Sequence, residues 1–140
     1  MHILQVEDNP GDIVLFREAL RPLSLSVEIS VARNGEEALR ILHQEAPAAS
    51  SSPVDLILLD IKLPRENGFA VLAALQHDTE CQFIPVVVFS STANPQEVNR
   101  CYELGANAYM VKPFTLDDYV RKVHATVLFW QACQLRTLPE

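Results

Sequence analysis

A run of four aliphatic residues, 56–59, ends directly on Asp60. Because no polar residue interrupts the run, the pattern predicts a strand buried on both faces, as in parallel sheets, rather than one with a face in water. Asp60 would then lie at the carboxyl end of the strand, which is where open α/β sheets bind ligands. Further apolar segments predict four more strands, at 3–6, 27–31, 85–89 and 108–111.

Segments with helical periodicity alternate with these strands. Each begins at a residue that commonly caps a helix or starts its first turn; these starts are Asn9-Pro10, Asn34-Gly35, Asn67-Gly68, Asn94-Pro95 and Thr115. In the first helix Val14 is expected on the apolar face, and Gly105 is placed to end the fourth helix. Five strands alternating with five helices predict an α/β domain in which helices cover both faces of a parallel sheet.

Length and charge narrow the class of protein. At 140 residues the chain is expected to form one domain. A net charge of −7 and the lack of a Lys/Arg run argue against a nucleic-acid partner. No apolar stretch approaches the roughly 20 residues that cross a bilayer, and no signal segment is apparent, so we expect a soluble, cytoplasmic protein without a membrane partner.

Other sequence features suggest no site of their own. The three cysteines are widely spaced, which predicts neither a disulfide framework nor a CxxC metal site. The segment from Ala46 to Pro53 has the composition of an exposed loop. The histidines lack metal-ligand spacing and are expected at the surface; they are His2, His43, His77 and His124.

Polar residues follow four of the predicted strands, and a parallel sheet brings those positions to one edge. They are Glu7 with Asp8, Asp60, Ser90 and Lys112. Three neighbouring carboxylates repel one another unless a divalent cation binds among them, and oxygen ligands favour Mg²⁺. With a metal ion and a lysine to neutralise phosphoryl oxygens, an aspartate is a competent nucleophile toward phosphorus. A serine at this edge can donate a hydrogen bond to an arriving phosphoryl oxygen.

These residues give the chain a resemblance to the receiver domain of two-component response regulators over nearly its whole length. The matching features are Glu7-Asp8, Asp60 with Pro64 and Gly68 four and eight residues later, Ser90, and Lys112-Pro113-Phe114. The resemblance implies a flavodoxin-like, doubly wound sheet of five parallel strands in the order 2-1-3-4-5 with five helices. It also implies a single receiver domain, 1–140, without an output domain.

The resemblance also assigns roles to residues. It implies that Asp60 is the phosphoacceptor, that Asp8, Asp60 and the backbone carbonyl of Lys62 ligate Mg²⁺, and that Glu7 acts through metal-bound water. Lys112 is expected to contact the phosphoryl group. Its peptide bond to Pro113 is expected to be cis.

A switch pair is implied as well. On phosphorylation Ser90 is expected to move toward the phosphate and Tyr109 to turn inward, which repacks the face formed by the fourth helix, fifth strand and fifth helix. Uptake and hydrolysis of the phosphoryl group would be autocatalysed. Lys62 occupies a position that influences phosphoryl lifetime in the family.

Two kinds of partner are expected. The sequence from Glu7 to Asp12 is similar to that of stand-alone regulators paired with phytochrome histidine kinases, so a histidine kinase of that type is the expected phosphoryl donor. The last helix carries apolar residues outside its core stripe, namely Leu116, Val120, Leu128 and Phe129. We expect them to extend a homodimer interface along the fourth helix, fifth strand and fifth helix, the alternative being that the chain tail covers them.

Three other functions compete with this interpretation. Phosphatases and phosphotransferases with an aspartyl-phosphate intermediate typically place a second acid two residues after the nucleophile, where this chain has Lys62. A flavin-binding module needs a hydroxyl- and glycine-rich loop after the first strand, and Glu7-Asp8 would repel its phosphate. A pseudo-receiver that serves only as a scaffold remains open. We therefore interpret the chain as a phosphoacceptor switch and not as a turnover enzyme.

Overall fold

The computed structural model of the chain describes residues 1–23, 26–45, 52–63 and 66–135. Its centre is one sheet of five parallel strands in the order β2-β1-β3-β4-β5. The strands are β1 (His2–Val6), β2 (Glu28–Ala32), β3 (Leu56–Leu59), β4 (Val86–Ser90) and β5 (Ala108–Val111). The predicted parallel sheet and its strand order are confirmed.

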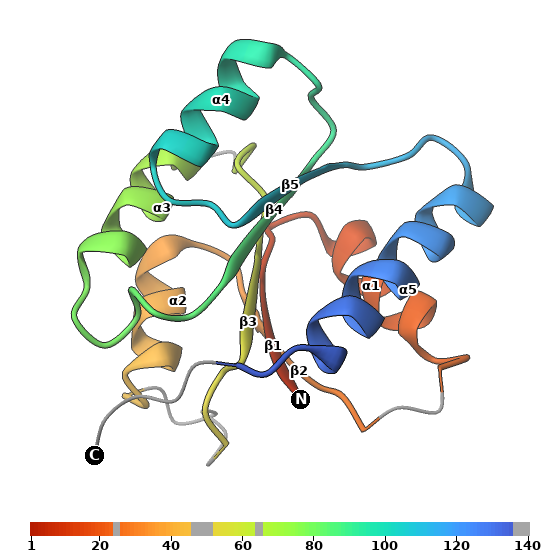
Figure 1. The fold of residues 1–140 in the computed structure, drawn as a ribbon, viewed down its shortest axis with the longest axis horizontal. Coiled ribbons are helices and arrows are strands. Elements are labelled where there is room, and N and C mark those ends of the chain that lie inside the picture. Colours follow the sequence, from red (N-terminus) through yellow and green to blue (C-terminus); the bar gives the residue numbers. More distant parts are fainter. Residues whose placement is uncertain (24–25, 46–51, 64–65, 136–140) are drawn as a thin grey trace.

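Five helices alternate with the strands and cover both faces of the sheet. They are α1 (Pro10–Leu20), α2 (Gly35–Leu42), α3 (Gly68–His77), α4 (Pro95–Glu103) and α5 (Leu116–Ala132). Figure 1 shows the sheet nearly edge-on, with α1 and α5 on one side and α2, α3 and α4 on the other. This arrangement is the doubly wound fold that the alternating pattern predicts.

The helices begin where the sequence predicts, because each is preceded by a side chain that satisfies a free backbone N–H of the first turn. The capping residues are Asn9, Asn34, Asn67, Asn94 and Thr115. Gly105, just after α4, has a φ of +102°, which a glycine adopts without steric cost. The expectation for Val14 is wrong: its exposed fraction is 58%, because it lies on the side of α1 that faces away from the core.

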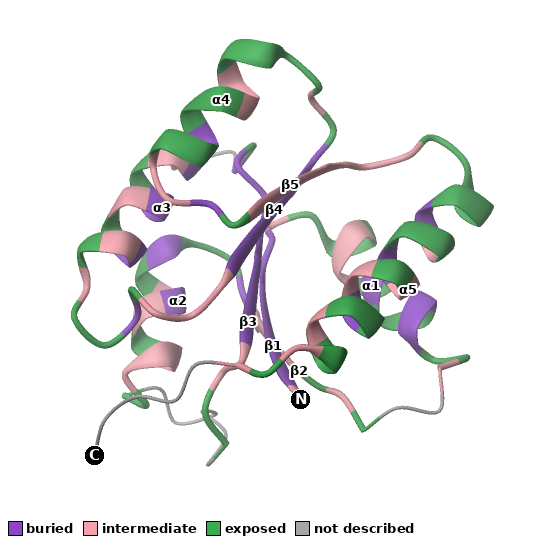
Figure 2. Cartoon of the chain, in the orientation of Figure 1, coloured by how far each residue is buried: buried purple, intermediate pink, exposed green. Residues whose placement is uncertain are grey.

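The three inner strands form the centre of the core. Every residue of β1, β3 and β4 is buried, whereas all four residues of β5 are only partly buried. Figure 2 shows this distribution, with buried strands between helices whose outer faces are exposed. The core consists of two apolar clusters, one under α2, α3 and α4 and the other under α1 and α5. This burial on both faces explains why the sequence at 56–59 contains no polar residue.

The expected surface position of the histidines is wrong for His2. This residue lies in β1 and is 3% exposed. Its ring Nδ1 donates to the Ser52 carbonyl oxygen at 2.9 Å, and its Nε2 lies 2.7 Å from the Ser30 hydroxyl. A buried imidazole is tolerated here because both of its nitrogens have partners.

Two other expectations concern the chain's loops and its membrane relation. Most of the expected loop from Ala46 to Pro53 lies outside the described residues, and the described Ser52 and Pro53 are exposed. Within the described ranges, none of the helices combines the length and apolar character that a membrane crossing requires.

Candidate functional site

The polar strand-end residues gather at the carboxyl edge of the sheet. Val6 pairs with Leu59, so the residues that follow them, Glu7 and Asp60, lie beside each other. Ser90 is the last residue of β4 and pairs with Val111, which precedes Lys112. The parallel topology alone therefore brings these four side chains to one place.

Lys112 is the centre of this group. Its Nζ donates to Glu7 Oε2 at 2.9 Å, to Asp60 Oδ2 at 3.0 Å and to Asp12 Oδ2 at 3.2 Å. The side chains of Lys112, Glu7 and Asp60 are only 12%, 6% and 9% exposed. One buried ammonium group thus neutralises part of the charge of three carboxylates.

Burial and neighbouring charges shift the proton affinities of this group. Burial raises the pKa of Glu7 to about 7; the Asp60 carboxylate acts in the same direction, and Lys112 opposes both. Burial would lower the pKa of Lys112, but the Asp60 and Glu7 carboxylates outweigh it and raise that pKa above its ordinary value. Lys112 is therefore firmly cationic, while the Glu7 carboxylate binds a proton more readily than an ordinary glutamate.

The loop after β3 fixes the Asp60 carboxylate. The Asp60 backbone N–H donates to the Val6 carbonyl oxygen at 3.1 Å, and Asp60 Oδ1 accepts a hydrogen bond from the Lys62 N–H at 2.9 Å. The start of α3 packs directly on this loop: a Cβ added at Gly68 would lie 2.7 Å from the Ile61 carbonyl carbon. A side chain at position 68 is incompatible with this approach. The nearby Pro64 lies outside the described residues.

An open cavity of about 300 Å³ lies beside Asp60, and several acidic side chains line it. Asp8 and Asp12 line it together with Glu7, Asp60 and Lys62. Glu7, Asp12 and Asp60 each present a carboxylate oxygen within 4.8 Å of the others. Such a set of hard oxygen donors fits a divalent cation such as Mg²⁺.

Asp12 is the member of this group to which the sequence analysis gave no role. Its N–H donates to the Asn9 cap at 3.1 Å, so Asp12 lies in the first turn of α1. Asp12 is the third residue after the cap. This spacing is the signal that could have placed it in the first turn of α1, at the sheet edge.

The Lys62 side chain points to α4. Its Nζ donates to Glu97 Oε1 at 2.7 Å, and Glu97 Oε2 accepts a hydrogen bond from the Thr92 hydroxyl at 2.8 Å. The bond to Glu97 raises the pKa of Lys62, and the same bond lowers the pKa of Glu97. The residue two positions after Asp60 is thus linked to the loop between β4 and α4.

Ser90 directly precedes that loop, and Tyr109 contacts it from β5. Ser90 Oγ is fully buried and makes no hydrogen bond of ordinary geometry within the described part of the chain. The Tyr109 hydroxyl donates to the Thr92 carbonyl oxygen at 2.8 Å. Burial raises the pKa of Tyr109, while the nearby Ser90 hydroxyl acts in the opposite direction. The two hydroxyl groups therefore lie near each other, and the Ser90 hydroxyl can still donate a hydrogen bond to an arriving group.

The expected cis bond between Lys112 and Pro113 is wrong, because no peptide bond among the described residues is cis. A trans bond is the favoured isomer even before proline, by about 0.5–1 kcal/mol. The long lysine side chain reaches Glu7 and Asp60 from a trans backbone, so the cis isomer is not needed to aim it.

Comparison with known proteins identifies the family. The model of the response regulator receiver domain matches residues 3–124. Response regulator Rcp1 of Synechocystis sp. is 35% identical over 128 residues, which cover 91% of this chain and 87% of that protein.

Two solved structures agree with this match. The phosphorylated cyanobacterial phytochrome response regulator RcpA has a TM-score of 0.88 and 37% identity, covering 97% of this chain and 98% of that one. The Mn²⁺-bound form of Rcp1 has a TM-score of 0.86 and 34% identity, covering 97% and 99%. The chain therefore belongs to the family of response regulator receiver domains, the phosphoacceptor switches of two-component signalling.

Proposed function

We propose that this receiver accepts a phosphoryl group on Asp60 from a phosphohistidine of a sensor histidine kinase, with Mg²⁺ as the metal ion. One observation carries the proposal: the Lys112 ammonium lies 3.0 Å from the Asp60 carboxylate, in a buried site at the carboxyl edge of the sheet. The unpaired Ser90 hydroxyl at the same edge supports it, because a phosphoryl oxygen would supply the missing partner.

On the side of the receiver, the proposed transfer uses groups at this edge of the sheet. A carboxylate oxygen of Asp60 forms a bond to phosphorus, while the phosphorus–nitrogen bond to the kinase histidine breaks and its electron pair returns to the imidazole. Lys112 stabilises the negative charge on the transferring oxygens. Attack of water on the acyl phosphate later releases inorganic phosphate and restores Asp60. Both steps are autocatalysed in this proposal.

The cavity beside Asp60 is the proposed metal site. Its proposed ligands are Asp8, Asp60 and the backbone carbonyl of Lys62, with Glu7 acting through water. We include Asp12 as a further candidate, because it lines the same cavity and its carboxylate lies near those of Glu7 and Asp60. When bound, Mg²⁺ supplies positive charge that offsets the phosphoryl oxygens. The preference for Mg²⁺ rests on the all-oxygen donor set, and the Mn²⁺-bound form of Rcp1 supports a divalent ion.

Incubation with acetyl phosphate and Mg²⁺, followed by intact-mass analysis, tests the acceptor. We expect one phosphoryl adduct on the wild-type protein, none on Asp60→Asn, and an unchanged adduct on Asp117→Asn. The control removes a carboxylate that is exposed in the first turn of α5 and does not line the cavity beside Asp60. An adduct that survives in Asp60→Asn would exclude Asp60 as the acceptor, and a wild-type protein without any adduct would leave the scaffold interpretation.

The proposed phosphoryl donor is a phytochrome histidine kinase. RcpA, whose structure matches this chain closely, is a phytochrome response regulator. The proposal places the protein in the cytoplasm, and its three free thiols fit a reducing compartment.

The proposed output is a change on the face formed by α4, β5 and α5, on which the protein dimerises. Ser90 and Tyr109 are the proposed switch, because Tyr109 lies in β5 and its hydroxyl holds the loop that precedes α4. Leu116, Leu128 and Phe129 are exposed on α5 and offer apolar surface to a second copy.

A further inference from the structure

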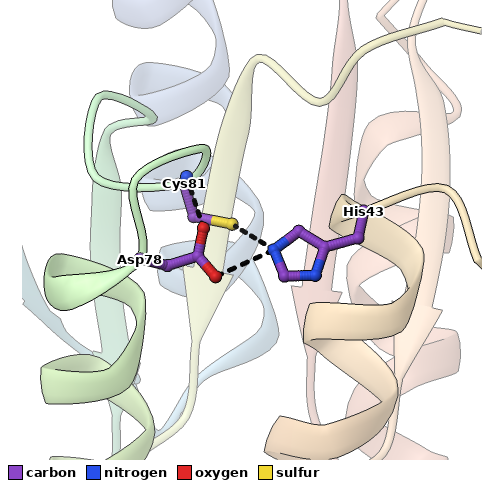
Figure 3. A group of neighbouring side chains, drawn as sticks. All are labelled: His43, Asp78 and Cys81. Carbon is purple, nitrogen blue, oxygen red and sulfur yellow. Dashed lines mark hydrogen bonds and ion pairs between the residues drawn. The ribbon is translucent and has the colours of Figure 1, made fainter.

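A second cluster of chemically reactive side chains lies at the opposite edge of the sheet from Asp60. His43 caps the end of α2, Asp78 follows α3, and Cys81 lies in the turn that leads to β4. Figure 3 shows the three side chains pointing toward one another, His43 from the end of α2 and the other two from the connection between α3 and β4. His43 Nε2 lies 2.8 Å from Asp78 Oδ2 and 3.9 Å from Cys81 Sγ.

The geometry differs from that of a nucleophilic triad. In a Cys-His-Asp triad the acid bonds one ring nitrogen and the thiol bonds the other, so that the imidazole relays a proton between them. Here both Asp78 and Cys81 approach the same nitrogen, Nε2 (Figure 3). One nitrogen, one oxygen and one sulfur atom within 4.8 Å of one another form an arrangement that can share a single ion.

The surrounding contacts orient the donors. Asp78 Oδ1 accepts hydrogen bonds from the Glu80 N–H at 2.9 Å and the Cys81 N–H at 3.1 Å, which leaves Oδ2 facing His43. Outer hydrogen bonds of this kind fix ligating carboxylates in metal sites. Glu80 Oε2 lies 3.7 Å from His43 Nε2 and offers a fourth donor at the exposed side.

We propose that His43, Asp78 and Cys81, completed by Glu80, form a binding site for a transition-metal ion of the zinc type, separate from the phosphoryl site. Nitrogen, sulfur and carboxylate oxygen in a four-donor set match Zn²⁺, whereas Mg²⁺ takes oxygen ligands. Binding releases the Cys81 thiol proton, and the imidazole proton moves from Nε2 to Nδ1. The bound ion links α2 to the turn between α3 and β4.

The alternative is an ion pair between His43 and Asp78 that serves only to hold α2. Such a pair would not need the Cys81 sulfur, which is 1% exposed, beside the same nitrogen. Metal binding and a bare ion pair differ in whether the sulfur becomes a ligand, and that difference can be measured.

Titration with Co²⁺, in excess Mg²⁺ that occupies the acidic cavity, provides the test. A Cys101→Ala/Cys133→Ser protein retains Cys81 as its single cysteine. We expect it to show a sulfur-to-cobalt charge-transfer band that saturates at one equivalent and disappears when Zn²⁺ is added. Adding Cys81→Ser should abolish the band, and His43→Ala should weaken binding by roughly tenfold or more, since loss of outer-shell partners alone costs about that much.

Two control variants separate this site from the rest of the molecule. His77→Ala removes an exposed histidine whose Nδ1 bonds the Ala73 carbonyl oxygen of its own helix, and it should leave binding unchanged. Asp60→Asn should also leave the band unchanged, so a failed phosphoacceptor assignment and a failed metal site give different results.

The proposal is overturned if the single-cysteine protein shows no thiolate band, or if the band persists without Cys81. If substitution at a buried cysteine prevents folding, zinc-edge X-ray absorption on a Cys133→Ser protein, which retains both buried cysteines, gives the same answer. A sulfur atom in the first coordination shell supports the site, and a shell of only nitrogen and oxygen contradicts it.

Discussion

At the scale of single residues, Lys112 governs the electrostatics of the proposed phosphoacceptor site. Its ammonium group contacts three carboxylates that would otherwise repel one another in a buried pocket. Because the charges are largely hidden from water, their interaction is little screened by solvent. The lysine is therefore expected to contribute to the stability of the fold as well as to phosphoryl transfer.

We expect Lys112→Ala to lower the free energy of unfolding in metal-free buffer by about 3 kcal/mol, since removing one partner of a buried ion pair leaves the other charge unpaired. Urea denaturation measures the loss, and added Mg²⁺ should reduce it by neutralising the same carboxylates. Lys122→Ala is the matched control, because that lysine is exposed and its Nζ bonds only the Val111 carbonyl oxygen in the described structure. Equal effects of the two substitutions would contradict this role.

The contact between Lys62 and Glu97 is expected to lengthen the lifetime of the phosphoryl group. Glu97 holds the Lys62 ammonium on α4. We expect Glu97→Gln to release it toward the phosphoryl group and to accelerate hydrolysis roughly tenfold, less than the 10²–10³ of a fully preorganised donor. Loss of the phosphoryl adduct over time, followed by intact mass, gives the rate. In a Lys62→Met background the same Glu97 substitution should have no effect; a persisting effect would show that Glu97 acts through Thr92 instead.

The sequence predicts some site residues better than others for a physical reason. Glu7, Asp60 and Lys112 follow strands, so the parallel topology alone places them together. Asp12 and Glu97 lie on helices. The cap spacing places Asp12 in the first turn of α1, but the side-chain contacts of both residues depend on helix rotation and side-chain conformation, which no local pattern encodes. The cis bond was carried over from the family, and this backbone departs from it.

At the scale of elements, the caps explain why helix starts are predictable. A cap side chain bonds an N–H two or three residues ahead of it, so the signal is contained in a few consecutive residues. Which face of a helix is buried depends on contacts with residues distant in the sequence. Val14 is an example, because the local pattern predicts it on the apolar face but it is exposed. The packing of α3 against the loop that follows Asp60, here called the acceptor loop, is likewise a contact between elements, and it depends on Gly68.

We expect Gly68→Ala to destabilise the protein by about 1–3 kcal/mol, the usual cost of overpacking. The added Cβ would force α3 away from the Ile61 backbone, which follows Asp60 directly. Chemical denaturation should show the loss, and the initial rate of phosphorylation by acetyl phosphate should fall with it. Gly11→Ala is the control, because its nearest neighbour is a side-chain atom of Asn9 at 3.2 Å. An unaltered phosphorylation rate in Gly68→Ala would show that the acceptor loop does not depend on this packing.

At the scale of the whole molecule, the sheet separates two chemically different edges. The carboxyl edge carries Asp60 and Lys112, and the opposite edge carries the cluster of His43, Asp78 and Cys81. The face of α4, β5 and α5 lies to the side of both and exposes apolar residues of α5. The two edges can therefore be altered independently.

We expect Phe129→Ser to weaken self-association by roughly tenfold or more, because a large aromatic residue that is buried in an interface contributes strongly to it. Sedimentation velocity at micromolar concentration, with and without acetyl phosphate, measures the change. Val14→Ser is the control: Val14 is 58% exposed and Phe129 60%, but Val14 lies on α1, outside the proposed interface. A wild-type protein that sediments as a monomer in both conditions would exclude the dimer.

The close approach of α3 to the acceptor loop has a consequence for engineering. Gly68, at the start of α3, has no room for a side chain, whereas Lys62, on the loop itself, has a half-exposed side chain whose ammonium group donates to Glu97. The loop and the start of α3 thus combine one position that is closed to variation, 68, with one that is open to it, 62. A library of variants with different phosphoryl lifetimes should randomise positions 62 and 97 together and keep glycine at 68. The lifetime of the phosphoryl group would then change while the fold remains intact.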